Sequence, residues 1–185
     1  MIYDTLIIGG GVSGMQCALV LGSAKNKPFA IDKNIGIILH QRISHLENAL
    51  FNNVLGLYPG TLGKDILTQG KEQLTNLYPH VSQIENEKVL SIDESQESYK
   101  ITTNKNVYDS KVVVLALNYA KPFTIKGLEM LIIPHEKSNP KKDRIQLTNT
   151  NHFIKHGIYC CGTIAGWRSQ FAIAACPPGW TNNNN

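Results

Sequence analysis

The stretch that decides the fold is YDTLIIGGGVSG, residues 3–14, in which an apolar run typical of a β-strand leads directly into a cluster of glycines. Gly9, Gly11 and Gly14 satisfy the pattern G-x-G-x-x-G, and a helix-like segment follows them. In such a unit the first glycine permits the tight turn, the second lets a pyrophosphate approach the backbone, and the third lets the helix pack against the sheet. The stretch therefore predicts a dinucleotide-binding β-α-β unit.

The second strand of this unit is predicted at 29–32, a short apolar run that ends in a carboxylate. That carboxylate, Asp32, comes 18 residues after Gly14. An acid at the end of the second strand can accept hydrogen bonds from both hydroxyls of a ribose. We therefore expect Asp32 to hold the ribose of the dinucleotide.

Composition favours one globular domain. The chain has 185 residues, of which 42% are hydrophobic and 17% are charged, so a sizeable core fits but a second full domain does not. We expect the domain to span 1–176 and a polar, disordered tail to span 177–185. The net charge is +4, and the basic residues are scattered along the chain apart from a cluster of Lys141, Lys142 and Arg144. We interpret that cluster as a solvated loop, not as a nucleic-acid surface.

No apolar run approaches the roughly 18 residues that a membrane-spanning helix needs, and Met1 leads directly into the first strand. We therefore expect a soluble, cytoplasmic protein with no membrane partner.

Four cysteines, Cys17, Cys160, Cys161 and Cys176, show neither a C-x-x-C spacing nor a metal-ligand pattern, so no metal is expected. Buried, reduced thiols are the simplest interpretation. Cys160 and Cys161 are candidate relay thiols only if their sulfurs approach a cofactor. His40 and His45 are candidate acid–base groups, with surface loop histidines as the alternative.

Further along the chain the pattern changes several times. The periodicity predicts a helix over 63–78, and short strands with period two then predict a β-meander at 88–92, 99–103 and 107–108. A fully apolar strand at 112–117 follows, and its carboxyl end at Asn118 is where ligands sit in open α/β sheets. A further central strand is predicted at 157–163 and a last helix at 167–176.

In this order the segments resemble the FAD domain of the thioredoxin reductase-like flavoproteins, within the pyridine nucleotide-disulfide oxidoreductase group. The resemblance covers most of 1–176. It rests on the glycine loop, LGLYPG at 55–60 with GKDIL at 63–67, the meander, the strand at 111–117, IKGLE at 125–129, and the strand at 157–163. It implies an α/β, Rossmann-like, three-layer FAD-binding fold with a central parallel sheet and a three-stranded β-meander.

The resemblance also implies which residues contact FAD. The glycine loop and first helix would hold the pyrophosphate, the acid after the second strand the ribose, the meander the adenine, and the start of the last helix the flavin ring. The implied contacts are Gly9, Gly10, Gly11, Val12, Ser13, Gly14, Asp32, Lys33, Val89, Ala116, Leu117, Asn118, Gly162, Thr163, Gln170 and Phe171.

The chain departs from the family pattern in three ways. Only 118–156 lies where the family inserts an NADPH domain, and that span is too short for a second nucleotide domain. The C-x-x-C pair carried by that domain is missing with it. Leu117 and Asn118 replace the Thr-Gly of the family's Ala-Thr-Gly strand end, and Thr163 replaces an aspartate that contacts the cofactor.

Three functions remain open from the sequence. The first is a minimal FAD-dependent oxidoreductase. An electron-donor protein or diffusible NAD(P)H would reduce its flavin, and a thiol, a disulfide or a small molecule would accept the electrons. The second is a non-catalytic module that binds FAD or another dinucleotide, as a sensor or a partner subunit. The third is a one-domain NAD-binding protein, which leaves the meander unexplained. Homodimerisation is an expectation that comes from the family alone.

Overall fold

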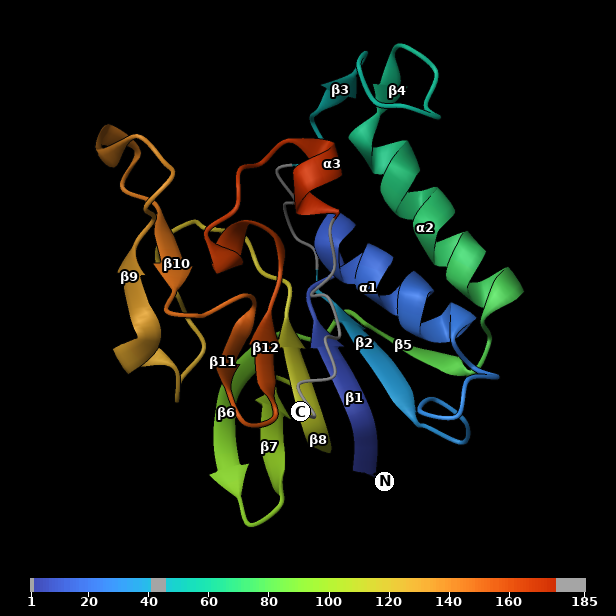
Figure 1. Ribbon diagram of the computed structural model, residues 1–185, viewed down its shortest axis with the longest axis vertical. Coiled ribbons are helices and arrows are strands. Elements are labelled where there is room, and N and C mark those ends of the chain that lie inside the picture. Colours follow the sequence, from blue (N-terminus) through green and yellow to red (C-terminus); the bar gives the residue numbers. More distant parts are fainter. Residues whose placement is uncertain (1, 41–45, 176–185) are drawn as a thin grey trace.

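The computed structural model describes residues 2–40 and 46–175 and is built around one mixed sheet (Figure 1). Its main path runs β11-β12-β8-β1-β2-β5, and β6 and β7 continue it beside β8. The strands are β1 (Ile2–Ile8), β2 (Ile35–Leu39), β5 (Val81–Glu85), β6 (Val89–Ser95), β7 (Ser98–Thr103), β8 (Val107–Leu115), β11 (Phe153–Lys155) and β12 (Ile158–Cys160).

The centre of the sheet is parallel: β1 pairs in parallel with β2 and β8, while β5 and β12 extend the parallel set on either side. The meander strands β6, β7 and β8 pair antiparallel in sequence order. Two further hairpins stand apart from the sheet, β3 (Leu50–Phe51) with β4 (Thr61–Leu62), and β9 (Ile132–Pro134) with β10 (Ile145–Leu147).

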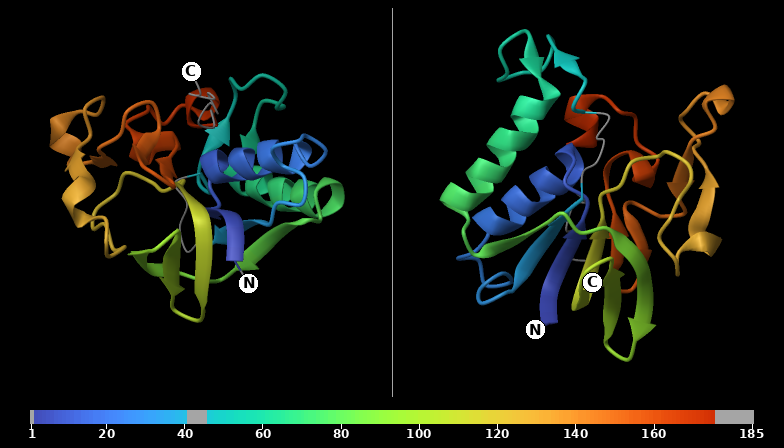
Figure 2. Two further views of the ribbon diagram at one scale, coloured as in Figure 1. Left: turned by 60° about the horizontal axis from the view of Figure 1, so that its bottom comes forward. Right: turned by 180° about the vertical axis from the view of Figure 1, so that it is seen from behind.

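Two cores separate three layers. Helices α1 (Val12–Ser23) and α2 (Gly63–Leu77) cover one face of the sheet, as both views of Figure 2 show. Residues alternate along β1 because successive side chains point to opposite faces. Ile7 packs with α1 in one core, whereas Leu6 and Ile8 pack in the other with the meander residues Val89 and Ile101. Fully buried β1 residues thus contribute to both cores.

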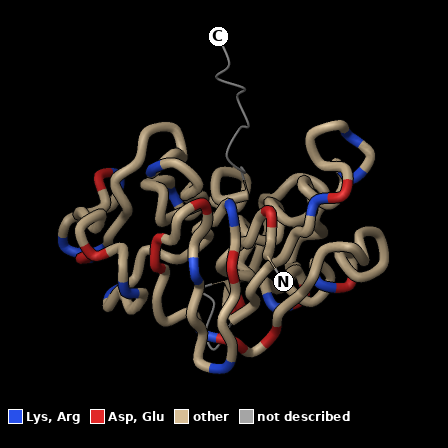
Figure 3. Tube along the Cα trace, turned by 90° about the horizontal axis from the view of Figure 1, so that it is seen from below, with Lys and Arg blue, Asp and Glu red and all other residues tan. Residues whose placement is uncertain are grey.

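Most of the predicted architecture is confirmed. The α/β fold with a largely parallel sheet, the meander and the helix beginning at Gly63 are all present. The last helix is shorter than predicted, since α3 spans only Phe171–Ala174. Cys176 and the predicted tail at 177–185 lie outside the described residues. The charged residues are spread along the chain around the molecule, as the coloured trace in Figure 3 shows.

One strand prediction is wrong, and two other predicted strands are parts of a single strand. Residues 29–32 form turns, and the second strand is β2 at Ile35–Leu39. The side chains of Phe29 and Ile31 are 70% and 56% exposed, so that apolar run does not pack as a strand would. The predicted strands at 107–108 and 112–117 are one continuous strand, β8. Its first half pairs with β7, and its pairing with β1 runs on to Leu115.

Candidate functional site: a cleft at the glycine loop

The glycine loop joins β1 to α1 at the carboxyl edge of the sheet. Gly9 has φ +118°, a conformation that other residues rarely adopt, and a Cβ there would collide with the carbonyl oxygen of Ala116 on the neighbouring chain segment. A Cβ on Gly14 would collide with the carbonyl oxygen of Gly9. Both glycines are therefore required by packing within the protein itself.

Gly11 is different, because a Cβ built on it would meet no atom within 4 Å among the described residues. Its φ of −75° is open to any residue, so neither packing nor conformation demands glycine there. Gly11 is the N-cap of α1 and makes no side-chain cap. The open space in front of it faces a helix N-terminus, where free N–H groups and the helix dipole favour an anion.

The open space belongs to a cleft with two lobes. The first, which we call the loop lobe, has a volume of about 200 Å³. The glycine loop lines it together with the chain segment after β8, and Phe51 and Phe171 lie across from them with ring centroids 5.3 Å apart. Among the predicted contact residues, this lobe is lined by Gly9, Gly10, Gly11, Val12, Ser13, Ala116, Leu117, Asn118, Thr163 and Phe171.

The second lobe, the meander lobe, has a volume of about 380 Å³ and is lined by Glu87, Val89 and the segment 122–125. Gly9, His40, Leu117 and Asn118 line both lobes, so the two form one continuous cleft along the carboxyl edge of the sheet. The predicted contact at Val89 lies in this second lobe, at the far end of the cleft from Gly11.

Glu87 is a feature of the meander lobe that sequence reasoning missed. Its carboxylate accepts hydrogen bonds from Thr103 Oγ1 (2.6 Å), Asn106 Nδ2 (2.7 Å) and the Tyr108 hydroxyl (2.8 Å). Burial alone would raise the pKa of Glu87, but these three donors and the charge of Lys105 lower it below its ordinary value. A fixed negative charge therefore stands at this end of the cleft.

Asp32 does not lie at the cleft, so its prediction as the ribose-binding acid is wrong. The carbonyl of Asn34 accepts hydrogen bonds from the backbone of Asp4 (2.9 Å) and Thr5 (3.3 Å), which places this turn beside the beginning of β1. Gly9 follows the opposite end of that strand. Lys33 lies in the same turn and pairs with Asp4 at 3.7 Å, so it is also remote from the glycine loop.

The residue that follows the true second strand is His40. It is exposed and lines both lobes, which is the position at which a ribose-binding acid was expected. The signal for this position was present in the sequence. Ile35–Leu39 is a continuous apolar run that is buried along its whole length, as the central strand of a parallel sheet should be. His45, the other candidate histidine, lies outside the described residues.

The chain segment after β12 closes one side of the loop lobe. Gly162 adopts φ +71° and packs against Ser13, whose hydroxyl donates a hydrogen bond to the carbonyl of Ala174 (2.5 Å). Thr163 Oγ1 donates to the carbonyl of Leu117 (3.4 Å). The short helix α3 thus contacts the first turn of α1. Gln170, its N-cap, lines a separate cavity together with Arg168 and Ser169.

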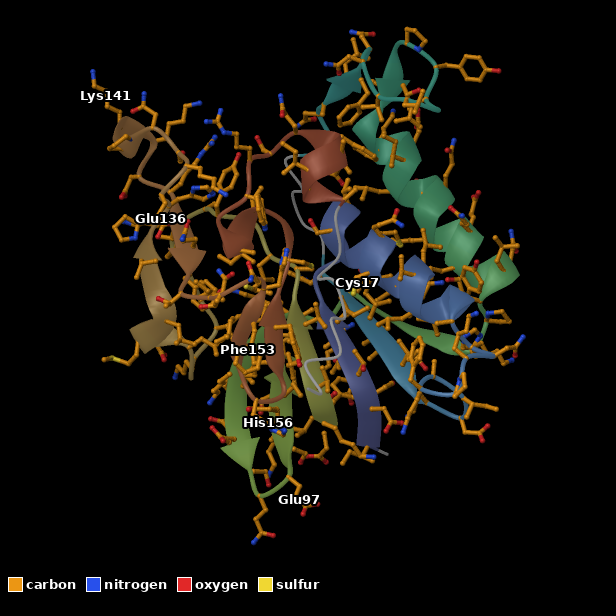
Figure 4. The ribbon with its side chains drawn as sticks, in the orientation of Figure 1. Cys17, Glu97, Glu136, Lys141, Phe153 and His156 are labelled. Carbon is orange, nitrogen blue, oxygen red and sulfur yellow. The ribbon has the colours of Figure 1, made fainter. Side chains whose placement is uncertain are left out.

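Cys160 and Cys161 are buried, as predicted for reduced structural thiols, and neither forms a disulfide within the described residues. Cys160 belongs to the core on the meander side of the sheet and Cys161 to the core on the helix side. Burial raises the pKa of Cys160 to about 12, and that of Cys17, a buried residue of α1 (Figure 4), also to about 12. Neither cysteine of the vicinal pair lines the cleft, so the structure does not support their prediction as relay thiols.

No cluster of three metal-ligating side chains occurs within the ranges 2–40 and 46–175. Within the same ranges, none of the helices has the length and apolar character required to cross a membrane.

The fold and the cleft together define an α/β, Rossmann-like protein with a glycine loop at the N-terminus of its first helix. The sequence model of the pyridine nucleotide-disulphide oxidoreductases matches residues 3–156, so the chain belongs to that family.

Curated relatives include ferredoxin–NADP reductases. The protein from Streptococcus pneumoniae is 28% identical over 132 residues, which cover 69% of this chain and 40% of that protein. The protein from Geobacillus thermodenitrificans is 25% identical over 115 residues, which cover 62% of this chain and 33% of that protein. The chain therefore matches about two fifths or less of the length of these relatives.

Solved structures with the same fold include an oxidoreductase from Agrobacterium tumefaciens, with a TM-score of 0.55 at 22% identity, covering 71% of this chain and 42% of that one. Thioredoxin reductase from T. acidophilum gives a TM-score of 0.52 at 22% identity, covering 69% of this chain and 39% of that one. At this identity the likeness establishes the fold.

Proposed function

We propose that this chain binds FAD in the glycine-loop cleft and acts as a FAD-dependent oxidoreductase. The observation that carries the proposal is the geometry at Gly11. A helix N-terminus opens there onto unfilled space, and a continuous cleft runs from that point to Val89 in the meander. Family membership and the reductases among the relatives support the same conclusion.

The residues that line the cleft fit the parts of a dinucleotide. Gly9 to Ser13 would hold the pyrophosphate, with Gly14 packing the helix against the loop, and Val89 would lie at the adenine. His40 would face the ribose in place of the predicted Asp32, donating or accepting a hydrogen bond according to its protonation state. Thr163 and Phe171 would border the flavin side of the loop lobe. The bound flavin would supply reversible uptake of a hydride or of single electrons.

The electron donor would come from outside this chain. Between Asn118 and His156 the structure has the hairpin of β9 and β10, two short 3-10 helices and β11, rather than a nucleotide-binding domain. We propose a separate donor protein or diffusible NAD(P)H as reductant, and a thiol, a disulfide or a small molecule as acceptor. We further propose that the protein forms a homodimer and that it acts in the cytoplasm.

A second candidate function is a binding module that holds FAD or another dinucleotide without turnover. Two observations favour it: His40 stands where a ribose-binding carboxylate was expected, and the carbonyl of Ala174 bonds to Ser13 in the first turn of α1. Loss of a charged hydrogen bond to the ribose weakens binding, because a charged acceptor contributes more than a neutral one.

The first experiment separates these functions. The purified protein is denatured, and the released cofactor is identified by chromatography and its visible absorption. FAD is expected. The intact protein is then mixed anaerobically with NADH, NADPH or dithiothreitol, and bleaching of the flavin band followed by reoxidation supports the oxidoreductase. Flavin that is bound but cannot be reduced supports the binding module. Stabilisation by NAD and not by FAD would contradict both.

The second experiment tests the site with Gly11→Ala and Gly11→Val. Because a side chain at Gly11 meets open space, both variants are expected to keep the thermal unfolding midpoint of the parent. FAD content is expected to fall in the order glycine, alanine, valine, since each added methyl group occupies the place of the pyrophosphate. Full FAD content in the Gly11→Val variant would place the cofactor elsewhere.

A further inference from the structure

A second cavity, of about 270 Å³, lies between the β9–β10 hairpin and the segment 167–170. We call it the basic cavity. Four cationic side chains line it, together with one histidine and one serine that matter for the argument: Lys137, Lys142, Arg144, Arg168, His135 and Ser138. Among the described residues, the lining includes no aspartate or glutamate.

Two polar side chains of this cavity are buried without a partner. His135 is only 7% exposed, and neither of its ring nitrogens has a hydrogen-bond partner within the described part of the chain. The same holds for the hydroxyl of Ser138. Buried polar groups are almost always hydrogen-bonded, because an unpaired one forfeits its hydration without compensation. His135 and Ser138 are therefore unpaired polar groups at the wall of the cavity, and a ligand that reached them would supply the missing hydrogen bonds.

Aromatic rings, and not acids, contact two of the four cationic side chains. Lys137 Nζ lies 3.7 Å from the centroid of the Trp167 ring, and the guanidinium of Arg144 lies 4.0 Å from that of Tyr119. None of the four cations forms an ion pair with a carboxylate of the described residues. The cavity thus keeps its positive charge uncompensated.

The acids nearby do not alter this balance. Asp143 pairs instead with Lys121, with 2.6 Å between Oδ1 and Nζ, and Glu136 does not line the cavity. Lys141 belongs to the same short 3-10 helix as Lys142 but stands at the outer tip of the hairpin (Figure 4) and does not line the cavity either.

We propose that the basic cavity binds the phosphate group of a small molecule. Two arginine forks, two ammonium groups, an imidazole and a hydroxyl supply more donors than one carboxylate can use, and they suit a dianion with three terminal oxygens. The volume exceeds that of a phosphate group, so the ester part of a phosphomonoester also fits. Tyr119 and Ser169 line both this cavity and the loop lobe, so the bound molecule lies next to the cleft. The proposal does not depend on FAD.

Trp167 provides a direct readout because it lines the cavity and carries Lys137 on its ring. The chain has two tryptophans, and Trp180→Phe leaves Trp167 as the single emitter. In that background the emission is followed during titration with inorganic phosphate and, separately, with ribose 5-phosphate. A saturable change is expected with both if free phosphate suffices, and at a lower concentration with the ester if the organic part contributes. Sodium chloride and sodium acetate at equal ionic strength serve as controls.

Substitutions then assign the signal to the site. Arg168→Gln and Arg144→Gln are each expected to weaken phosphate binding about tenfold, the usual consequence of losing one charge-assisted hydrogen bond. Lys155→Gln is the matched control, because Lys155 pairs with Glu94 away from the cavity, and it should bind as the parent does. His135→Phe should also weaken phosphate binding. If that variant does not fold, the titration of Arg168→Gln still tests the proposal, because Arg168 is exposed and its replacement should not disturb the fold.

Two results would overturn the proposal. The first is an emission change that chloride or acetate reproduces at the same ionic strength. The second is equal phosphate affinity in Arg168→Gln, Arg144→Gln and Lys155→Gln.

Discussion

The glycine-loop cleft and the basic cavity adjoin one another, yet they are constructed in opposite ways. The cleft is shaped by backbone: Gly9 and Gly14 are packed so closely that a methyl group would collide with a carbonyl oxygen. The basic cavity is shaped by side chains whose charges have no partner within the described residues. A site made of backbone constrains the fold and the ligand together, whereas a site made of surface cations can change with little effect on the fold.

The largest effect on stability is expected from Gly14→Ala. Its new methyl group would collide with the carbonyl oxygen of Gly9, so α1 would have to move away from the sheet. Such overpacking costs on the order of 3 kcal/mol of unfolding free energy. Urea unfolding monitored by circular dichroism measures it, and Gly11→Ala, where the methyl group meets open space, is the matched control. Equal midpoints for the two variants would contradict the division between packed and open glycines.

A smaller effect is expected from Glu87→Gln at the other end of the cleft. Loss of the charged acceptor for Thr103, Asn106 and Tyr108 should lower the unfolding free energy by about 1–2 kcal/mol at pH 7. Because the pKa of Glu87 is lowered from its ordinary 4.5, this stability is present above that pH and disappears as the pH falls through the lowered value.

The difference between parent and Glu87→Gln should therefore shrink in acid. Unfolding free energies measured from pH 7 down to pH 3 test this directly. Glu94→Gln is the control, because Glu94 is exposed and pairs only with Lys155 among the described ion pairs. A pH-independent difference for Glu87→Gln would show that the carboxylate is not held in its charged form.

The smallest effect is expected in the basic cavity. Lys142→Gln should leave the unfolding free energy within about 0.5 kcal/mol of the parent and should raise it slightly at low salt, because it relieves repulsion among like charges. Lys111→Gln should act in the opposite direction, since Lys111 pairs with Asp4 at 2.9 Å. Thermal melts at two salt concentrations test both signs. A clear loss of stability in Lys142→Gln would mean that its charge supports the fold.

The same contrast explains what could be predicted from the sequence. The roles of Gly9 and Gly14 follow from local backbone requirements, and the loop was recognised from its spacing. Asp32 misled because an apolar run with a terminal acid stood at a plausible distance from Gly14, while the buried strand Ile35–Leu39 came shortly after it. Hydrophobicity alone did not separate the two runs, although the second is longer and more uniformly apolar.

The basic cavity was not predictable in this way. Arg144 and Arg168 come from separate segments, and only tertiary structure brings them beside His135. The cluster of Lys141, Lys142 and Arg144 was interpreted as a solvated loop. That interpretation holds for exposed Lys141, but Lys142 and Arg144 line the cavity. Whether a basic residue faces solvent or a cavity depends on packing that the order of residues does not reveal.

Strand β8 has a consequence for how the molecule is assembled. It supplies the inner neighbour of β1, and the residue just after it, Ala116, forms the wall against which Gly9 rests. Gly9 and Ala116 are more than a hundred positions apart in the sequence. During synthesis the first strand therefore emerges long before this partner, and the glycine loop cannot take its final shape until the meander has been made.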